Sequence, residues 1–157
     1  MNHDYLVMRA EKWLNDVGCN VVIRDPFRSS NIEQPDAIGW RSGISILIEC
    51  KASRSDFLAD QKKIFRKNPG RGMGDWRFYM APKGIIQVSD LPLWWGLLEV
   101  TEKTIKKTHG VPKGNCYWAP GKFIDVNKRA ETIMMLSALR RMQIRGHLPE
   151  IYQGIPK

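Results

Sequence analysis

Two carboxylates and an ammonium group near the middle of the chain are the side chains best suited to metal chemistry. Asp36 follows a proline, and Glu49 and Lys51 come 13 and 15 residues after it. Carboxylates that lie close together repel one another, and burying them without a partner costs free energy. A bound divalent cation offsets both effects, because hard cations prefer oxygen ligands. The three residues therefore predict a cation site, provided that the fold brings them together.

The stretch 44–52, ISILIECKA, predicts the strand that carries Glu49 and Lys51. Successive side chains of a strand point to opposite faces, so we expect one face in the core and one that carries the charged pair. The core face would hold Ile44, Ile46, Ile48 and Cys50, and the other face Ser45, Leu47, Glu49 and Lys51.

A second apolar run, 34–40, precedes this strand, and the segment 41–43 between them (RSG) has the composition of a hairpin turn. The pair predicts an antiparallel hairpin. Folding about its middle pairs residues whose numbers sum to about 84 or 85, which sets Asp36 beside Glu49. We therefore expect both carboxylates and the Lys51 ammonium to converge at one end of a sheet.

At these residues the chain resembles the PD-(D/E)XK nuclease superfamily. Pro35-Asp36, twelve further residues and then Glu49-Cys50-Lys51 match its motif. The following segment, up to Lys62, resembles the strand-to-helix passage of small bacterial and phage members related to DNA repair. The resemblance covers residues 1–101. It implies an α/β fold with a restriction-endonuclease-like core, in which helices flank a central mixed β-sheet.

The resemblance also implies an activity, that of a Mg²⁺-dependent deoxyribonuclease, most simply an endonuclease, with Mn²⁺ as a substitute metal. Asp36, Glu49 and the backbone carbonyl of Cys50 would hold the metal, which makes bound water acidic enough to act at neutral pH. Lys51 would orient that water or stabilise charge on the phosphate oxygens. DNA repair, recombination and phage DNA processing are the implied settings.

Two further polar residues are candidates for completing the site. Glu11 lies at the margin of the apolar stripe of a helix expected over 4–17, and a first-helix glutamate often joins the metal site in this family. Gln61 lies on the buried face of a helix expected over 55–67, where the water shell of a metal would satisfy its amide. The alternatives are a surface glutamate and an amide at the helix edge.

The rest of the chain predicts one domain over residues 1–157. Further strands are expected at 19–24, 77–81 and 95–101, whereas the basic segment 102–121 shows no clear period. A C-terminal helix is expected over about 127–145, flanking the sheet. Two apolar sets should be buried: Phe57, Leu58, Ile64 and Phe65 on the middle helix, and Met135, Leu136, Leu139 and Met142 on the C-terminal helix.

The chain is basic, with 25 Lys and Arg against 16 Asp and Glu and a formal charge of +9. This excess favours an anionic partner such as DNA, although a basic protein without such a partner has the same composition. A run of charges on a helix is likewise typical of a solvated face. The candidate DNA-binding residues are Arg54, Lys62, Lys63, Arg66 and Arg71.

Other classes find less support. The chain lacks a G-x-S-x-G elbow, and Cys19, Cys50 and Cys116 form no C-x-x-C, which disfavours a zinc ribbon or a disulfide framework. No apolar run approaches about 20 residues, so we expect no membrane partner and a cytoplasmic location.

The alternative function is a non-cutting nucleic-acid-binding or regulatory protein of the same fold. A homodimer would suit double-strand cutting.

Overall fold

The computed structural model describes residues 1–114 and 118–156, so Cys116 lies outside the described part. A six-stranded sheet runs in chain order, with parallel pairing on both sides of β4 and antiparallel pairing elsewhere. The expected α/β class with a central mixed sheet is confirmed. The strands are β1 (Val21–Arg24), β2 (Ala37–Arg41), β3 (Ile44–Cys50), β4 (Trp76–Pro82), β5 (Gly96–Val100) and β6 (Ile105–His109).

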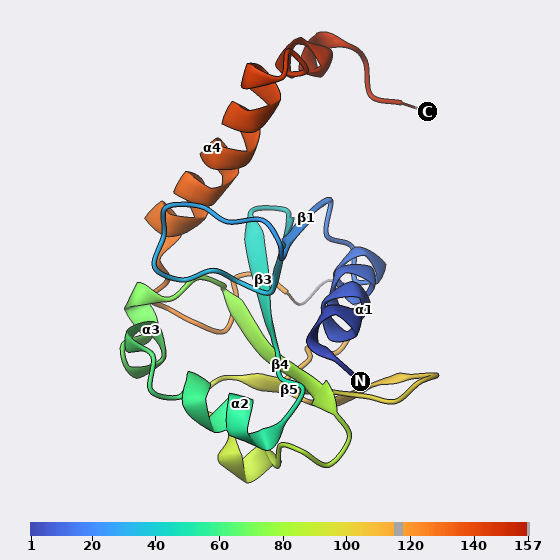
Figure 1. Ribbon diagram of the computed structural model, residues 1–157, viewed down its shortest axis with the longest axis vertical. Coiled ribbons are helices and arrows are strands. Elements are labelled where there is room, and N and C mark those ends of the chain that lie inside the picture. The colour runs from blue at the N-terminus through green and yellow to red at the C-terminus, as the bar shows by residue number, and fades with distance from the viewer. Residues whose placement is uncertain (115–117, 157) are drawn as a thin grey trace.

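Helices flank both faces of this sheet, as expected (Figure 1). On one face lies α1 (His3–Asp16), and on the other lie α2 (Arg54–Asp60) and α3 (Ile64–Lys67). Among the described residues, no helix is long and apolar enough to cross a membrane.

Strand β3 divides the core between these two faces. Ile46, Ile48 and Cys50 join the apolar cluster that contains the buried residues of α1, while Leu47 joins the cluster that contains Phe57 of α2. The expected division of the strand into two faces is thereby confirmed. Because Glu49 and Lys51 alternate with the first set, they lie on the α2 side of the sheet.

The expected hairpin is formed by β2 and β3. Ala37 pairs with Ile48, so paired numbers sum to 85, and the next step outward sets Asp36 opposite Glu49. The turn residues 42–43 have φ of 48° and 78°. Positive φ at both central residues is the requirement of a type I′ turn, whose twist matches that of the strands it joins.

The helix expected over 55–67 is interrupted. α2 ends at Asp60 and α3 begins at Ile64, and the break turns Arg66 inward to pair with Asp60. The two short helices therefore present different faces to the sheet. Both phenylalanines of the expected buried face are buried, but Leu58 and Ile64 are about half exposed, so the expectation for those two was wrong.

The C-terminal helix, α4 (Lys128–Ile144), lies within its expected range but projects from the body instead of covering the sheet (Figure 1). Its buried residues, Ala130, Glu131 and Met134, belong to the first turns. Glu131 accepts a hydrogen bond from the Trp40 indole at 3.0 Å, which fixes the side of the helix that faces the body. The expected core residues follow these turns, on the part of the helix that does not cover the sheet, and are 36–59% exposed, so that expectation was wrong: Met135, Leu136, Leu139 and Met142.

Strand β6 lies in the segment 102–121, for which no element was expected. Only Ile105 is apolar within it, so alternation of side-chain character gives no signal. The strand forms the edge of the sheet, where the lysines at 106 and 107 are exposed. Charged residues on an edge strand discourage pairing with other chains.

Candidate active site

Asp36, Glu49 and Lys51 line one surface pocket of about 430 Å³. Asp36 immediately precedes β2, Glu49 is the penultimate residue of β3, and Lys51 follows that strand. The structure thus brings the three residues of the motif together. Seven other residues line the pocket: His3, Gln34, Cys50, Asp56, Ala59, Asp60 and Lys63.

The Asp36 carboxylate is fixed to the strand that carries Glu49. Its Oδ2 accepts a hydrogen bond from the backbone N–H of Cys50 at 2.8 Å. Its Oδ1 lies 3.0 Å from His3 Nε2, at the start of α1. One oxygen is therefore anchored by the backbone, and the other is turned toward a histidine that borders the pocket.

Glu49 is the most deeply buried carboxylate of the motif, with a side chain 4% exposed. Its Oε1 lies 3.0 Å from Arg66 Nη2, and its Oε2 lies 3.7 Å from Lys51 Nζ. The Arg66 contact is an ion pair without hydrogen-bond geometry. Burial, reinforced by Asp36, raises the pKa of Glu49 well above its usual range despite these cations. A cation bound beside it would favour the charged form.

Lys51 lies between two carboxylates. Its Nζ is 3.2 Å from Asp60 Oδ1 and 3.7 Å from Glu49 Oε2. Burial by itself lowers the pKa of Lys51, but Glu49 and Asp60 more than offset this effect and raise it above its usual value. Lys51 is therefore an ammonium at neutral pH, able to donate hydrogen bonds and to stabilise negative charge but not to accept a proton.

Asp60, which was not among the predicted site residues, connects the residues of the site. Its Oδ1 lies 3.2 Å from Lys51 Nζ and 3.0 Å from Lys63 Nζ. Its Oδ2 accepts hydrogen bonds from Arg66 Nε at 2.8 Å and from the Tyr79 hydroxyl at 2.6 Å. Burial raises the pKa of Asp60, but Arg66 and Lys51 outweigh burial and hold it far below its usual range.

Arg66 is a buried guanidinium rather than a surface group. Its Nη1 donates to Glu33 Oε2 at 2.7 Å, so it contacts three carboxylates with Glu49 and Asp60. Its side chain is 1% exposed. The expectation that Arg66 contacts DNA is therefore wrong, because no part of its charge is left at the surface. Ion pairs hidden inside the fold cannot be distinguished from a solvated charge run by composition.

Gln61 and Glu11 differ in their relation to the site. The Gln61 amide donates to the Tyr79 hydroxyl at 2.8 Å, and that hydroxyl donates to Asp60, so Gln61 reaches the site through two hydrogen bonds. Glu11 lies elsewhere: its carboxylate pairs with Arg24 at 3.2 Å and does not line the pocket. Within the described residues, His3 is the first-helix residue that touches the site.

The other basic candidates occupy distinct positions. Lys63 is half exposed and lines the pocket, whereas Lys62 and Arg71 are exposed outside it. Arg54 forms a two-pronged pair with Asp90, at 2.9 and 3.1 Å. Lys62 and Arg71 therefore offer charge to an anionic ligand, while Arg54 already shares its charge with Asp90 and Lys63 shares its charge with Asp60.

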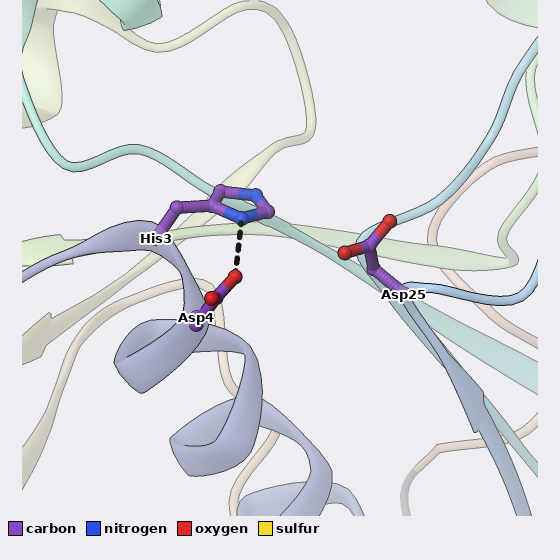
Figure 2. A group of neighbouring side chains, drawn as sticks. All are labelled: His3, Asp4 and Asp25. Atoms are coloured by element: carbon purple, nitrogen blue, oxygen red, sulfur yellow. Dashed lines mark ion pairs between the residues drawn. The ribbon is translucent and has the colours of Figure 1, made fainter.

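His3 also belongs to a small group beside the pocket. Figure 2 shows His3 and Asp4 on the first turn of α1 with Asp25 across from them, and one potential ligand atom of each lies within 4.8 Å of the others. Nδ1 of His3 is 3.8 Å from Asp4. Since His3 also contacts Asp36, this group extends the carboxylate-rich surface at the mouth of the pocket.

The chain is similar to a solved structure but to no known sequence family. No protein-family model and no curated protein matches the chain. A solved protein of unknown function from Silicibacter pomeroyi is 22% identical, with a TM-score of 0.61 over 100% of this chain and 99% of that chain. Similarity at this level of identity shows a shared fold alone.

Proposed function

We propose that the chain is a metal-dependent nuclease of the PD-(D/E)XK type that hydrolyses DNA phosphodiester bonds. One observation carries the proposal: Asp36, Glu49 and Lys51 converge on a single pocket at the end of β3. The hairpin register and the alternation of β3 produce that convergence, so it follows from the backbone and not from side-chain rotamers alone.

The donor groups fit Mg²⁺, with Mn²⁺ as a substitute. Asp36 and Glu49 provide carboxylate oxygens on neighbouring strands, and the family resemblance adds the Cys50 carbonyl. The raised pKa of Glu49 supports the assignment, because a charged carboxylate at that position needs more positive charge than the protein provides. When bound, the metal would stabilise charge on the phosphate and make the attacking water more acidic.

The remaining site residues would position this machinery. Lys51 would donate to a phosphate oxygen, and its raised pKa keeps it charged for that role. Asp60 would hold the Lys51 ammonium in the pocket through the 3.2 Å contact. Arg66 would hold both Glu49 and Asp60. Because Asp60 in turn holds Lys51, the Glu49 carboxylate and the Lys51 ammonium would keep a fixed separation.

DNA is the proposed substrate because of charge. The formal charge of +9 and the exposed Lys62, Lys63 and Arg71 near α3 suit a polyanion. A cytoplasmic location and a role in DNA repair, recombination or phage DNA processing belong to the same proposal, on the strength of the sequence and its resemblance.

A non-cutting nucleic-acid-binding or regulatory protein is the second candidate. The observation that favours it is the state of Glu49, which is nearly inaccessible and already paired with Arg66 and Lys51. Both of its oxygens already contact cations of the protein, which leaves less room for a metal to bind them. The two candidates agree on DNA binding and differ on cleavage.

Cleavage assays separate them. Plasmid, single-stranded and branched DNA would be incubated with the protein in Mg²⁺, Mn²⁺ or EDTA. We expect metal-dependent cleavage of at least one substrate, lost in Asp36→Asn and Glu49→Gln and kept in Glu102→Gln, a matched change at an exposed glutamate outside the pocket. DNA binding without cleavage of any substrate would favour the non-cutting candidate.

A further inference from the structure

Helix α4 presents an apolar stripe to solvent. Met135, Leu136, Leu139 and Met142, here called the stripe, are 36–59% exposed and follow one another at helical spacing. Further exposed apolar residues follow the helix, at Ile151, Tyr152 and Ile155.

The opposite side of the helix is already occupied. Arg141 lies over the Phe27 ring at 4.0 Å and donates to the Arg28 carbonyl, and Asn31 donates to the Ala130 carbonyl at 2.7 Å. The 27–31 loop therefore braces α4 along one side. Because the helix cannot turn its stripe inward without breaking these contacts, the stripe faces away from its own body.

Charge indicates what kind of surface would cover the stripe. On a helical wheel Arg129, Arg140 and Arg145 lie roughly 90° or more from its middle. Lys128 lies on the same side as the stripe, seven residues before Met135, but its ammonium already pairs with Asp75 and Glu131. An acidic partner would therefore find no unpaired cation on this side of the helix. An identical stripe, by contrast, meets it without opposing like charges at the contact, although the +9 charge of each copy repels at longer range.

The area is sufficient for a pair only when the C-terminal turn takes part. From their exposed fractions, the four stripe residues present about 350 Å², less than half of the roughly 800 Å² that one partner contributes to a standard interface. Ile151, Tyr152 and Ile155 bring the total to about 800 Å². The 3-10 turn Leu148–Tyr152 directly follows α4, so both regions can contribute to one continuous contact.

We infer that two copies of this chain associate through the stripe and the residues that follow it. Twofold pairing uses the same surface on both copies, which is the commonest arrangement of homo-oligomers and needs no second apolar patch elsewhere. The inference does not depend on nuclease activity, because the surface lies on a helix that contributes nothing to the pocket.

Sedimentation and light scattering without DNA or metal test it. The wild type should reach twice its chain mass of 18.1 kDa at micromolar concentrations, and the association should persist or strengthen as salt screens the repulsion. The double variant Leu136→Glu with Leu139→Glu should raise the dimer dissociation constant by at least roughly 100-fold, since it places four carboxylates in an apolar contact. Met8→Glu, at an exposed position of α1, should change nothing.

Three outcomes would overturn the inference. The first is a wild type that stays monomeric at every concentration, which would assign the stripe to a different partner. The second is a dimer that survives in the double variant while its melting temperature matches that of the wild type. The third is a dimer that dissociates as salt rises, because that dependence would identify a charged interface. Tyr152→Ser gives an independent reading, since it weakens the pair only if the C-terminal turn contributes.

Discussion

Replacing Arg66 by methionine would remove the one charge that three buried carboxylates share. Arg66 lies 2.7 Å from Glu33, 2.8 Å from Asp60 and 3.0 Å from Glu49, with a side chain 1% exposed. Removing one partner of a buried ion pair costs about 3–5 kcal/mol, because the other charge is left uncompensated. At roughly 2–4 °C per kcal/mol for a chain of this size, the melting temperature should fall by about 10 °C.

The pH dependence of this loss gives a second, independent reading. Arg66 lowers the pKa values of Asp60 and Glu49, so its loss should raise both, and the folded variant should bind protons that the folded wild type does not. Its stability relative to the wild type is therefore recovered as pH falls from 8 toward 5. In the wild type the pKa of Asp60 is lowered. Its contribution to the stability of the fold is therefore fully present above the pKa of an aspartate in the unfolded chain, about 4, and is lost only as the pH falls below that value.

Thermal melts at pH 8, 7, 6 and 5 would measure both effects, with Lys67→Met as a matched control at the exposed neighbouring position. The control should melt within about 2 °C of the wild type, because surface changes have small effects. If Arg66→Met melted at the same temperature as Lys67→Met, the buried ion network would not stabilise the fold as argued. The same would hold if the melting temperature of Arg66→Met fell below that of the wild type by the same amount at every pH.

Three further predictions concern ligands. Mg²⁺ or Mn²⁺ should raise the wild-type melting temperature by mass action, and Asp36→Asn and Glu49→Gln should lose that shift in thermal-shift assays; if both retained it, the metal would bind elsewhere. The shift should be larger at pH 8 than at pH 6, because protons compete for Glu49, whose pKa is raised, and a shift independent of pH would contradict this. DNA affinity, measured by fluorescence anisotropy, should fall as salt rises because binding releases counterions from phosphates; an affinity indifferent to salt would exclude a charge-driven interaction.

The hairpin was predictable because its signals are local. Side chains alternate along β3, the turn residues tolerate positive φ, and the resulting register sets Asp36 opposite Glu49. These signals lie within 15 residues of one another, so no knowledge of the rest of the fold is needed to place the acids and Lys51 at one end of the sheet.

The residues that surround the motif were not predictable in the same way. Arg66 meets Glu33, 33 positions away in sequence, only because α2 stops at Asp60 and α3 turns the guanidinium inward. One available signal was the spacing of Asp60, three residues after the buried Phe57 on the same helical face, where a carboxylate needs a partner.

The exposure of α4 shows a different limit of sequence patterns. An apolar stripe indicates which side of a helix avoids water, but it does not indicate whether the same chain or another copy covers it. Here the side that meets the body is selected by Glu131 and Arg141, through Trp40 and Phe27. Polar contacts of this kind leave no periodic signature in the sequence.

Single-turnover cleavage at saturating DNA, measured across a Mg²⁺ titration for the wild type and Lys51→Ala, tests the central claim most directly. If the Lys51 ammonium stabilises the transition state, the variant should cleave roughly 100-fold or more slowly at every metal concentration. Its metal-induced thermal shift and most of its DNA affinity should remain. A variant rate restored by high Mg²⁺ would reduce Lys51 to a counter-ion for Glu49 and Asp60, and a wild type that cleaves no DNA would contradict the proposed nuclease activity.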